Sequence, residues 1–296
     1  AYTERVPPNT DVAASVRRTA GRKSQEAAGA SARDALVPLV EALERSEGSE
    51  RGPIIRALER VTGQELGLDM AAWRQLADGV EPAALRRSPQ HPPHVVGIPL
   101  YGRRLVMIVG TGTDNENEHP FKDRKRLEAL CKVPGGRDVA WVRLRTKRQF
   151  FYAHAARVVM DLPAGSSFEL IGPTGNLHKL FGRLTPVNPG TETQAAKVRE
   201  KLKLAIDVDH HAALHTALDV SGKRDSIAWR KGPDEIVLLA GTSPWQVDVT
   251  DMDVIGAEIA LKARLRMVPV HTIGVGSHPY PMMVPISEQS GGTYLG

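Results

Sequence analysis

The chain has 296 residues, of which 41% are hydrophobic and 25% are charged. These values are ordinary for one large or two modest globular domains, and they exclude collagen-like, wholly disordered and disulfide-scaffold proteins. The single cysteine, Cys131, cannot form a disulfide within the chain, and it excludes a cysteine-rich zinc site. The sequence has no run of about 18 consecutive apolar residues, so we expect no membrane-spanning helix.

Positive charge is concentrated in one segment of the chain. The formal net charge is +5, but residues 122–148 contain ten Lys and Arg side chains against only Asp123, Glu128 and Asp138. The remainder of the chain therefore carries a small net negative charge. This placement makes the basic segment a candidate contact surface.

The first 30 residues contain few large apolar side chains. Pro7, Pro8 and Asn9 are followed mainly by Ala, Ser, Arg and Gly, which cannot offset the entropy of ordering unless a partner covers them. We expect residues 1–30 to form an extended arm. The chain begins at Ala1 without a charged and then apolar leader, as a mature secreted chain does. A trimmed chain looks the same, and we favour an extracytoplasmic location.

Residues 31–81 have the apolar spacing of short helices. One stripe covers residues 36–43, and a second follows Pro53, a residue that commonly occupies the first turn of a helix. Gly63 ends the second stripe, and a third helical piece carries Trp73. The segment therefore predicts a small all-α region.

A linker and a different pattern follow. Residues 82–94 contain four prolines and predict a linker. Beyond them, continuous apolar runs are typical of strands that are buried on both faces. Helical stretches separate the runs, which predicts an α/β fold with a doubly wound, mostly parallel sheet. The predicted strands are 105–109, 168–171, 236–240 and 268–275, and the predicted helices are 149–162, 193–204, 210–218 and 254–265.

The order of these segments in residues 95–296 resembles that of a von Willebrand factor A domain. The resemblance rests on LPAGSSFEL at 162–170, HHAALHTAL at 210–218, IVLLAGTSP at 236–244, VHTIGVG at 270–276 and SGGTY at 290–294. Residues 35–73 resemble the HEAT-like helical pair that precedes such domains in bacterial extracytoplasmic proteins. The resemblance implies a sheet whose carboxyl edge binds a partner protein through a divalent cation.

The cation site of that family is degenerate in this sequence. The resemblance implies an Asp-x-Ser-x-Ser loop, a Thr and an Asp, oxygen ligands of the kind that Mg²⁺ prefers. We therefore expect no bound metal, and the alternative is a cation held by the displaced ligands Thr113, Asp114 and Asp209. The five corresponding positions, of which only Asp114 offers a side-chain oxygen, are Gly110, Gly112, Asp114, Val208 and Gly241.

Other catalytic and cofactor patterns are weak. The turn at 110–115 has neither the third glycine of a dinucleotide-binding loop nor a Walker lysine, so we expect no cofactor. No serine-nucleophile motif is present. Arg126 and Lys132 could lower the pKa of the Cys131 thiol, but the neighbouring Leu127 and Leu130 favour a packing role.

A histidine-rich segment suggests a second possible metal site. His211 and His215 are four residues apart and share a helix face, as ligands in zinc sites do. The Glu that zinc proteases place beside the first His is missing, and Asp209 is well placed to cap the helix. We favour a capped helix with surface histidines, and metal binding by His210, His211 or His215 stays open.

The basic segment belongs to a predicted insertion, residues 114–148, between the first strand and the first helix of the sheet domain. Alternation of charged and apolar side chains over residues 141–148 predicts an edge strand with one charged face. A solvated face, an acidic protein, a nucleic acid and an anionic membrane all remain candidate roles. Arginine pairs with carboxylates through two hydrogen bonds, which favours an acidic protein. Phe121 and Trp141 do not form an RNA-binding signature, so we expect no nucleic acid. The predicted contact residues are Lys122, Arg124, Lys125, Arg126, Arg143, Arg145, Lys147 and Arg148.

These features favour a non-enzymatic subunit of a protein assembly, which contacts other subunits through the arm and the insertion. A metal-dependent adhesion domain with displaced ligands is the first alternative. A zinc hydrolase that uses the 207–215 cluster is a more distant one.

Overall fold

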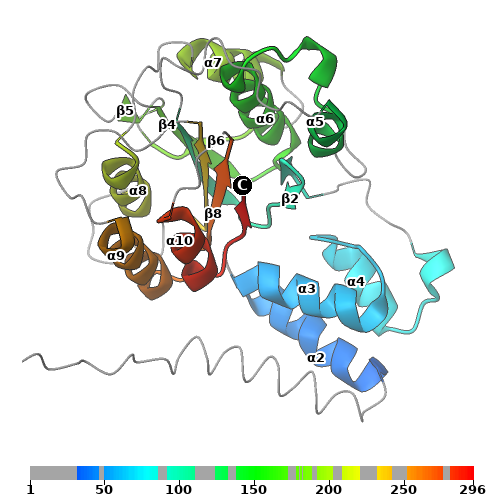
Figure 1. Cartoon of the computed structure of the whole chain (residues 1–296). Helices are drawn as coiled ribbons and strands as arrows, with labels where there is room; N and C mark the ends of the chain where they lie inside the picture. Colours follow the sequence, from blue (N-terminus) through cyan, green and yellow to red (C-terminus); the bar gives the residue numbers. More distant parts are fainter. Residues whose placement is uncertain are drawn as a thin grey trace, which may run out of the picture. The chain divides into compact units, whose positions relative to one another are not determined.

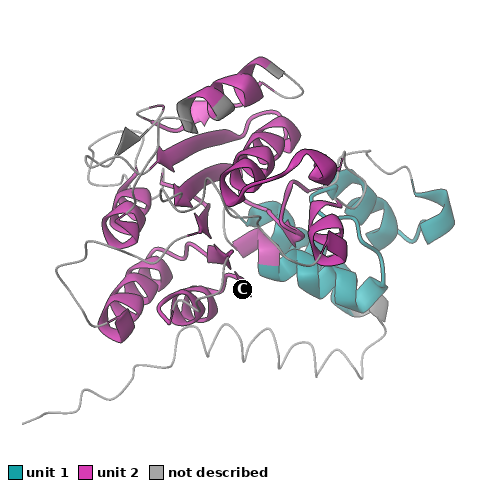
Figure 2. Cartoon of the chain, turned by 45° about the horizontal axis from the view of Figure 1, so that its top comes forward, with its two compact units in different colours: residues 1–46, 53–88 teal, residues 47–52, 89–296 magenta. Residues whose placement is uncertain are grey.

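The computed structural model describes residues 32–46, 50–85, 92–110, 124–132, 138–172, 178–179, 181, 183–188, 192–202, 209–220, 232–241, 252–275 and 281–296. The chain divides into two compact units (Figure 2). Unit 1 comprises residues 1–46 and 53–88, and unit 2 comprises residues 47–52 and 89–296. The predicted arm, residues 1–30, lies outside the described residues.

Unit 1 is built from short helices, as the apolar stripes predict. Its helices are α2 (Ala32–Arg45), α3 (Arg51–Thr62) and α4 (Met70–Ala77), followed by the 3-10 turn η2 (Pro82–Ala84). Leu43, Ile55 and Leu58 are buried between them. Trp73 is fully buried and donates a hydrogen bond from Nε1 to the carbonyl oxygen of Gly67 at 2.9 Å, which anchors the loop that precedes α4.

Unit 2 is organised around a mostly parallel sheet (Figure 1). The path of the sheet is β5-β4-β3-β7-β8-β9, and β6 pairs with the same strand β4 as β5 does. β3 pairs in parallel with β4 and β7, and β8 pairs in parallel with β7 and β9, whereas β5 and β6 are antiparallel to β4. A small hairpin of β1 (His94–Val95) and β2 (Ile98–Pro99) precedes the sheet. The strands of the sheet are β3 (Arg104–Gly110), β4 (Ser167–Gly172), β5 (His178–Lys179), β6 (Thr185–Pro186), β7 (Glu235–Ala240), β8 (Val270–Gly274) and β9 (Tyr294–Leu295).

Helices cover both faces of the sheet, which confirms the doubly wound α/β architecture. Side chains of β3 alternate between the two faces, so that Met107 joins one apolar cluster and Ile108 joins the other. The first cluster packs beneath α5 (Arg124–Cys131), α6 (Lys147–Asp161) and α7 (Glu192–Leu202). The second packs beneath α8 (His210–Asp219), α9 (Met252–Leu265) and α10 (Met283–Ser290). None of the helices within the described ranges is long and apolar enough to cross a membrane.

A buried histidine–glutamate pair joins the amino ends of the central strands. Glu235 Oε2 accepts hydrogen bonds from the backbone N–H groups of Tyr101 and Gly102 at 2.9 and 2.8 Å. Glu235 Oε1 lies 2.8 Å from Nε2 of His271, and Nδ1 of His271 accepts from the backbone N–H of Thr293 at 3.1 Å. A Cβ on Gly102 would lie 2.8 Å from the Cβ of Glu235, so only glycine allows this approach. We call Glu235 and His271 the amino-edge clamp.

The structure corrects the sequence predictions in the insertion. Residues 141–148 do not form an edge strand: Trp141–Arg143 is the 3-10 turn η4, and α6 begins at Lys147. Thr146 accepts a hydrogen bond from the backbone N–H of Gln149 and caps α6, which favours a helix over continued extension. Helix α5 within the insertion and helix α10 before the last strand were not predicted.

Candidate functional site

The carboxyl edge of the sheet brings together two of the five positions that correspond to the cation ligands of the von Willebrand factor A family. Gly110 ends β3, and Gly241 follows β7 and donates a backbone hydrogen bond to the carbonyl oxygen of Gly110 at 3.1 Å. This is the point at which connections from neighbouring strands diverge, where doubly wound sheets bind their ligands. Neither glycine supplies a side-chain ligand there. Gly112, Asp114, Val208 and the predicted contact residue Lys122 lie outside the described residues.

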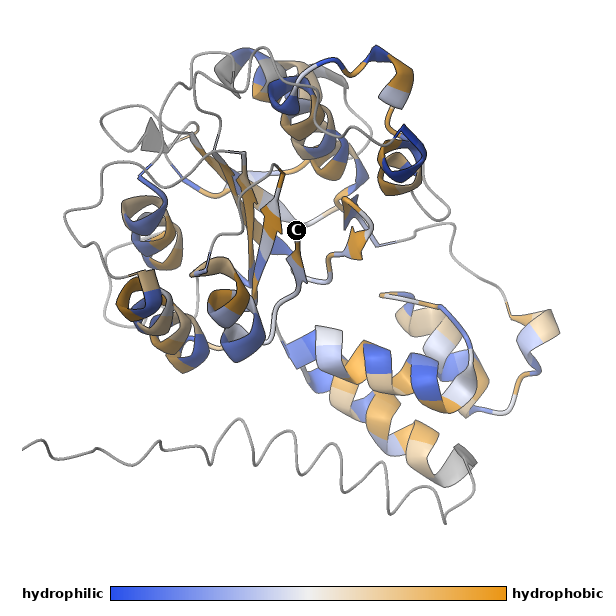
Figure 3. Ribbon diagram, viewed as in Figure 1, coloured by the Kyte–Doolittle hydropathy of each residue, from blue (hydrophilic) through white to orange (hydrophobic). Residues whose placement is uncertain are grey.

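The basic segment presents an exposed surface on α5 and η4. Arg124, Lys125 and Arg126 of α5 are exposed, as are Arg143 and Arg145 at η4. We call these five residues the basic face. The hydrophilic character of α5 is visible in Figure 3. Among the described residues, neither Arg143 nor Arg145 forms a side-chain ion pair, so both guanidinium groups are available to an acidic partner.

The basic face rests on a fixed apolar support. Leu127 and Cys131 of α5 and Leu144 after η4 are buried in the first apolar cluster of the sheet domain. The backbone N–H of Val139 donates to the carbonyl oxygen of Cys131 at 2.9 Å, which ties η4 to the end of α5. The basic residues of α5 and those at η4 are therefore held next to each other by core packing.

Two predicted contact residues are not part of the basic face. Lys147 is only 7% exposed in the first turn of α6 and cannot meet a partner surface. Arg148 donates a hydrogen bond from Nε to the hydroxyl oxygen of Tyr152, and its guanidinium lies 5.4 Å from the centre of that ring. Both residues lie in the first turn of α6 and not in a strand. The alternation expected of an edge strand therefore predicts their exposure wrongly.

Cys131 has a packing role. Its Sγ is buried and lies 3.8 Å from Nε2 of His154, which is also buried. Burial raises the pKa of the Cys131 thiol to about 12, with a smaller contribution from Asp138, and burial lowers the pKa of His154 to about 3. Near neutral pH the thiol is protonated and the imidazole is uncharged. The two side chains therefore do not form the thiolate–imidazolium pair of a cysteine nucleophile.

Asp209 caps α8, as predicted. Its Oδ1 accepts a hydrogen bond from the backbone N–H of Ala212 at 2.9 Å. The next residue, His210, is fully buried, and burial lowers the pKa of its imidazole to about 4 although the Asp209 carboxylate opposes this shift. His210 is therefore a buried, neutral ring, and it is not part of the group that contains its neighbour His211.

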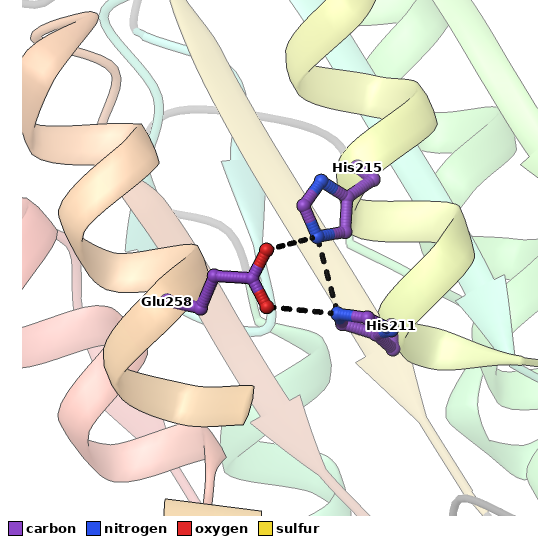
Figure 4. Close-up of side chains that lie close together, drawn as sticks. All are labelled: His211, His215 and Glu258. Atoms are coloured by element: carbon purple, nitrogen blue, oxygen red, sulfur yellow. Dashed lines mark hydrogen bonds and ion pairs between the residues drawn. The ribbon is translucent and has the colours of Figure 1, made fainter. Parts of the chain in front are cut away.

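His211 and His215 meet a glutamate from the neighbouring helix α9 (Figure 4). The Nε2 atoms of the two histidines are 3.1 Å apart. Glu258 places Oε1 3.1 Å from Nε2 of His215 and Oε2 3.4 Å from Nε2 of His211. Within the described residues this is the group of three His, Cys, Asp or Glu side chains whose geometry suits a metal ion.

Further polar side-chain contacts follow this group between α8 and α9. Lys262 Nζ lies 2.9 Å from Nδ1 of His215 and 2.9 Å from Oδ2 of Asp219, and Arg266 pairs with Asp219 at 2.6 Å. Residues 211, 215 and 219 of α8 thus face residues 258 and 262 of α9 and residue 266, which directly follows it, at intervals of about one turn. Burial and the nearby charges of Lys262 and His211 lower the pKa of His215, against the opposing effect of the Glu258 and Asp219 carboxylates.

The sequence prediction missed Glu258. A zinc-protease motif places its glutamate beside the first histidine, whereas here the glutamate lies 47 residues further along the chain, on another helix. The i, i+4 spacing of Glu258 and Lys262 is an ordinary pattern for a solvated helix face, so the sequence did not indicate that Glu258 is a metal ligand. Only the packing of α9 beside α8 makes this glutamate a partner of the two histidines.

Comparison with protein-family models and with curated proteins gives no match to this chain. The class of protein is therefore defined by the structure itself: a mostly parallel, doubly wound α/β domain with a separate unit of short helices.

Proposed function

We propose that the chain is a non-enzymatic subunit of an extracytoplasmic protein assembly, and that it docks onto an acidic partner through the basic face. In this proposal unit 2 is a domain of the von Willebrand factor A type whose cation site has been lost. The observation that carries the docking role is the set of exposed cations on α5 and η4, held in place by a buried apolar support.

Two further observations support the type of domain. The segments that resemble the family fall in order on α8, β7, β8 and β9, with 162–170 leading into β4. Gly110 and Gly241 adjoin each other at the carboxyl edge and bring no side-chain oxygen there. The alternative with displaced ligands needs Asp209, whose Oδ1 already caps α8.

Electrostatic docking has a direct test. We expect a partner to be recovered with the full chain from its own cells at low salt and to be released at high salt, because exposed charges are screened. The variant Arg143→Glu/Arg145→Glu should lower the affinity of that partner by about tenfold or more, since it converts two attractive contacts into repulsive ones.

A matched control reverses two exposed arginines elsewhere. Arg56 and Arg60 are exposed on α3 of unit 1, so Arg56→Glu/Arg60→Glu changes the net charge equally without touching the basic face. The control variant should bind the partner as tightly as the unmodified chain does. Circular dichroism should show that both variants are folded. Equal binding by both variants contradicts docking through the basic face, and release by nuclease would identify a nucleic acid instead.

A further inference from the structure

We propose that His211, His215 and Glu258 bind a divalent transition-metal ion, and that Zn²⁺ fits their ligand atoms. The site joins α8 to α9 on the face of the sheet opposite to α5, so it does not depend on the docking role of the basic face. Its ligand set is two imidazole nitrogens and one carboxylate (Figure 4).

The separations of the ligand atoms suit a tetrahedral ion. The two Nε2 atoms are 3.1 Å apart, and each lies against a different oxygen of Glu258, at 3.1 Å for His215 and 3.4 Å for His211. With one ligand atom taken from each residue, all three ligand atoms lie within 4.8 Å of one another. A tetrahedral zinc ion with bonds of about 2.0–2.1 Å holds its ligands about 3.3–3.4 Å apart. Rotation of the partly exposed Glu258 side chain can therefore bring one carboxylate oxygen to the distance that the ion requires.

The contacts of Nε2 of His215 explain how a cation can take the place of a proton at this position. Because an ammonium group can only donate, the contact of Lys262 Nζ with Nδ1 of His215 places the ring's proton on Nε2, which faces Nε2 of His211 and Glu258. Two imidazole nitrogens at 3.1 Å share at most one proton well. A divalent ion replaces that proton, accepts both nitrogen lone pairs and neutralises the carboxylate.

The site is open enough to load and to keep a further coordination position. The side chains of His211, His215 and Glu258 are 22%, 28% and 54% exposed. Metal sites with three protein ligands complete their tetrahedron with water or with a group of a partner. The geometry thus defines a link between two helices in which all three ligands are partly exposed.

Lys262 regulates the affinity of the site. Metal binding through Nε2 of His215 requires the ring proton to move to Nδ1, where Lys262 now donates, so the ammonium must withdraw to Asp219. Histidines that bind metal normally donate the other N–H to an acceptor. Lys262→Gln removes the competing charge and offers a carbonyl oxygen to Nδ1, so it should tighten binding by about tenfold.

The test is a calorimetric titration of the full chain, stripped with a chelator, with Zn²⁺ alone. We expect one equivalent to bind at this site, with affinity lowered more than about 100-fold by His215→Ala and by Glu258→Gln, because each removes a direct ligand. Co²⁺ in place of Zn²⁺ should give the visible absorption of a tetrahedral nitrogen and oxygen site in the full chain and lose it in both variants.

Matched controls separate this site from other metal contacts. Glu200 and Lys197 are exposed on α7, so Glu200→Gln and Lys197→Gln repeat the two chemical changes away from the site and should leave the zinc affinity unchanged. Circular dichroism of each metal-free variant establishes that it is folded. A chain that binds no zinc, or ligand variants that bind it as tightly as the unmodified chain, overturns the proposal.

Discussion

Two histidine–glutamate groups in the sheet domain have opposite environments. In the amino-edge clamp, the side chains of His271 and Glu235 are each 5% exposed, and backbone N–H groups from Tyr101, Gly102 and Thr293 occupy their remaining acceptor atoms. In the α8–α9 group, no backbone N–H contributes a hydrogen bond among the described contacts, and the ligand atoms of three side chains point to one place.

The difference in environment distinguishes a group that stabilises the fold from a group that can bind a ligand. A buried carboxylate whose lone pairs are taken by backbone donors has nothing left to offer a ligand, and its loss leaves unpaired groups in the core. A carboxylate that meets two histidines at the surface costs little to rearrange and keeps its lone pairs available. The same two residue types therefore stabilise the sheet at one end and form a candidate metal site on one face.

The largest expected effect is on the clamp. Glu235→Ala should lower the free energy of unfolding of the sheet domain by about 3–5 kcal/mol, because the N–H groups of Tyr101 and Gly102 lose their acceptor inside the protein. Hydrogen exchange of the β3 and β7 amides measures this loss in unit 2 separately from unit 1. Glu235→Gln, which keeps an acceptor oxygen, should recover part of the lost stability.

The matched substitution Glu200→Ala removes an exposed glutamate from α7 and should change stability by less than about 0.5 kcal/mol. If Glu235→Ala were no more harmful than this control, Glu235 would not act as a clamp.

Local patterns in the sequence predicted most of the sheet domain. Apolar runs identified β3, β4, β7 and β8 because strands buried on both faces need no polar alternation. Asp209 was predicted to cap α8 because an N-cap needs only a polar side chain immediately before a helix. Helix α5 was missed because Leu127 and Cys131 are its only buried side chains and the rest of it is dominated by charge.

The functional pairings depend on tertiary contacts that local patterns do not encode. Glu235 and His271 lie 36 residues apart, and neighbouring parallel strands bring them together. Glu258 reaches His211 only because α9 packs beside α8. Alternation of Arg143 and Arg145 with Val142 and Leu144 suggested a strand, but Val142 is exposed and Thr146 caps a helix there. A turn between two helices can produce the same alternation over a few residues.

His154 shows what burial does to a histidine that has no carboxylate partner in the described part of the chain. His154 is fully buried, its Nδ1 lies 3.4 Å from the backbone N of Val96, and burial lowers its pKa to about 3. The unfolded chain takes up a proton at this residue below about pH 6.5, whereas the folded chain does not until about pH 3. The contribution of His154 to stability is therefore complete above pH 6.5 and is lost as the pH falls toward 3.

The expected size of this effect is about 1.4 kcal/mol per pH unit for one histidine. Urea unfolding at a series of pH values from 6 to 4 should give a slope that is smaller by this amount in His154→Gln than in the unmodified chain. The difference in slope is the readout, since the substitution also changes stability at every pH by altering the core. Equal slopes would mean that His154 is not a neutral buried ring.

The smallest expected effect concerns the α8–α9 group in the absence of metal. Glu258 is half-exposed and, within the part of the chain that the structure describes, pairs with two partly exposed histidines. Glu258→Gln in chelator-treated protein should therefore change the free energy of unfolding by less than about 0.5 kcal/mol. With Zn²⁺ at 100 times its dissociation constant, the unmodified chain should gain about 2.7 kcal/mol, because the ion binds the folded state. The variant should gain almost nothing. Hydrogen exchange of the α8 amides, with and without Zn²⁺, measures the stability lost without metal and the stability gained with it. A large loss without metal would place Glu258 with Glu235 as a structural carboxylate, and a loss that appears only with metal would mark it as a ligand.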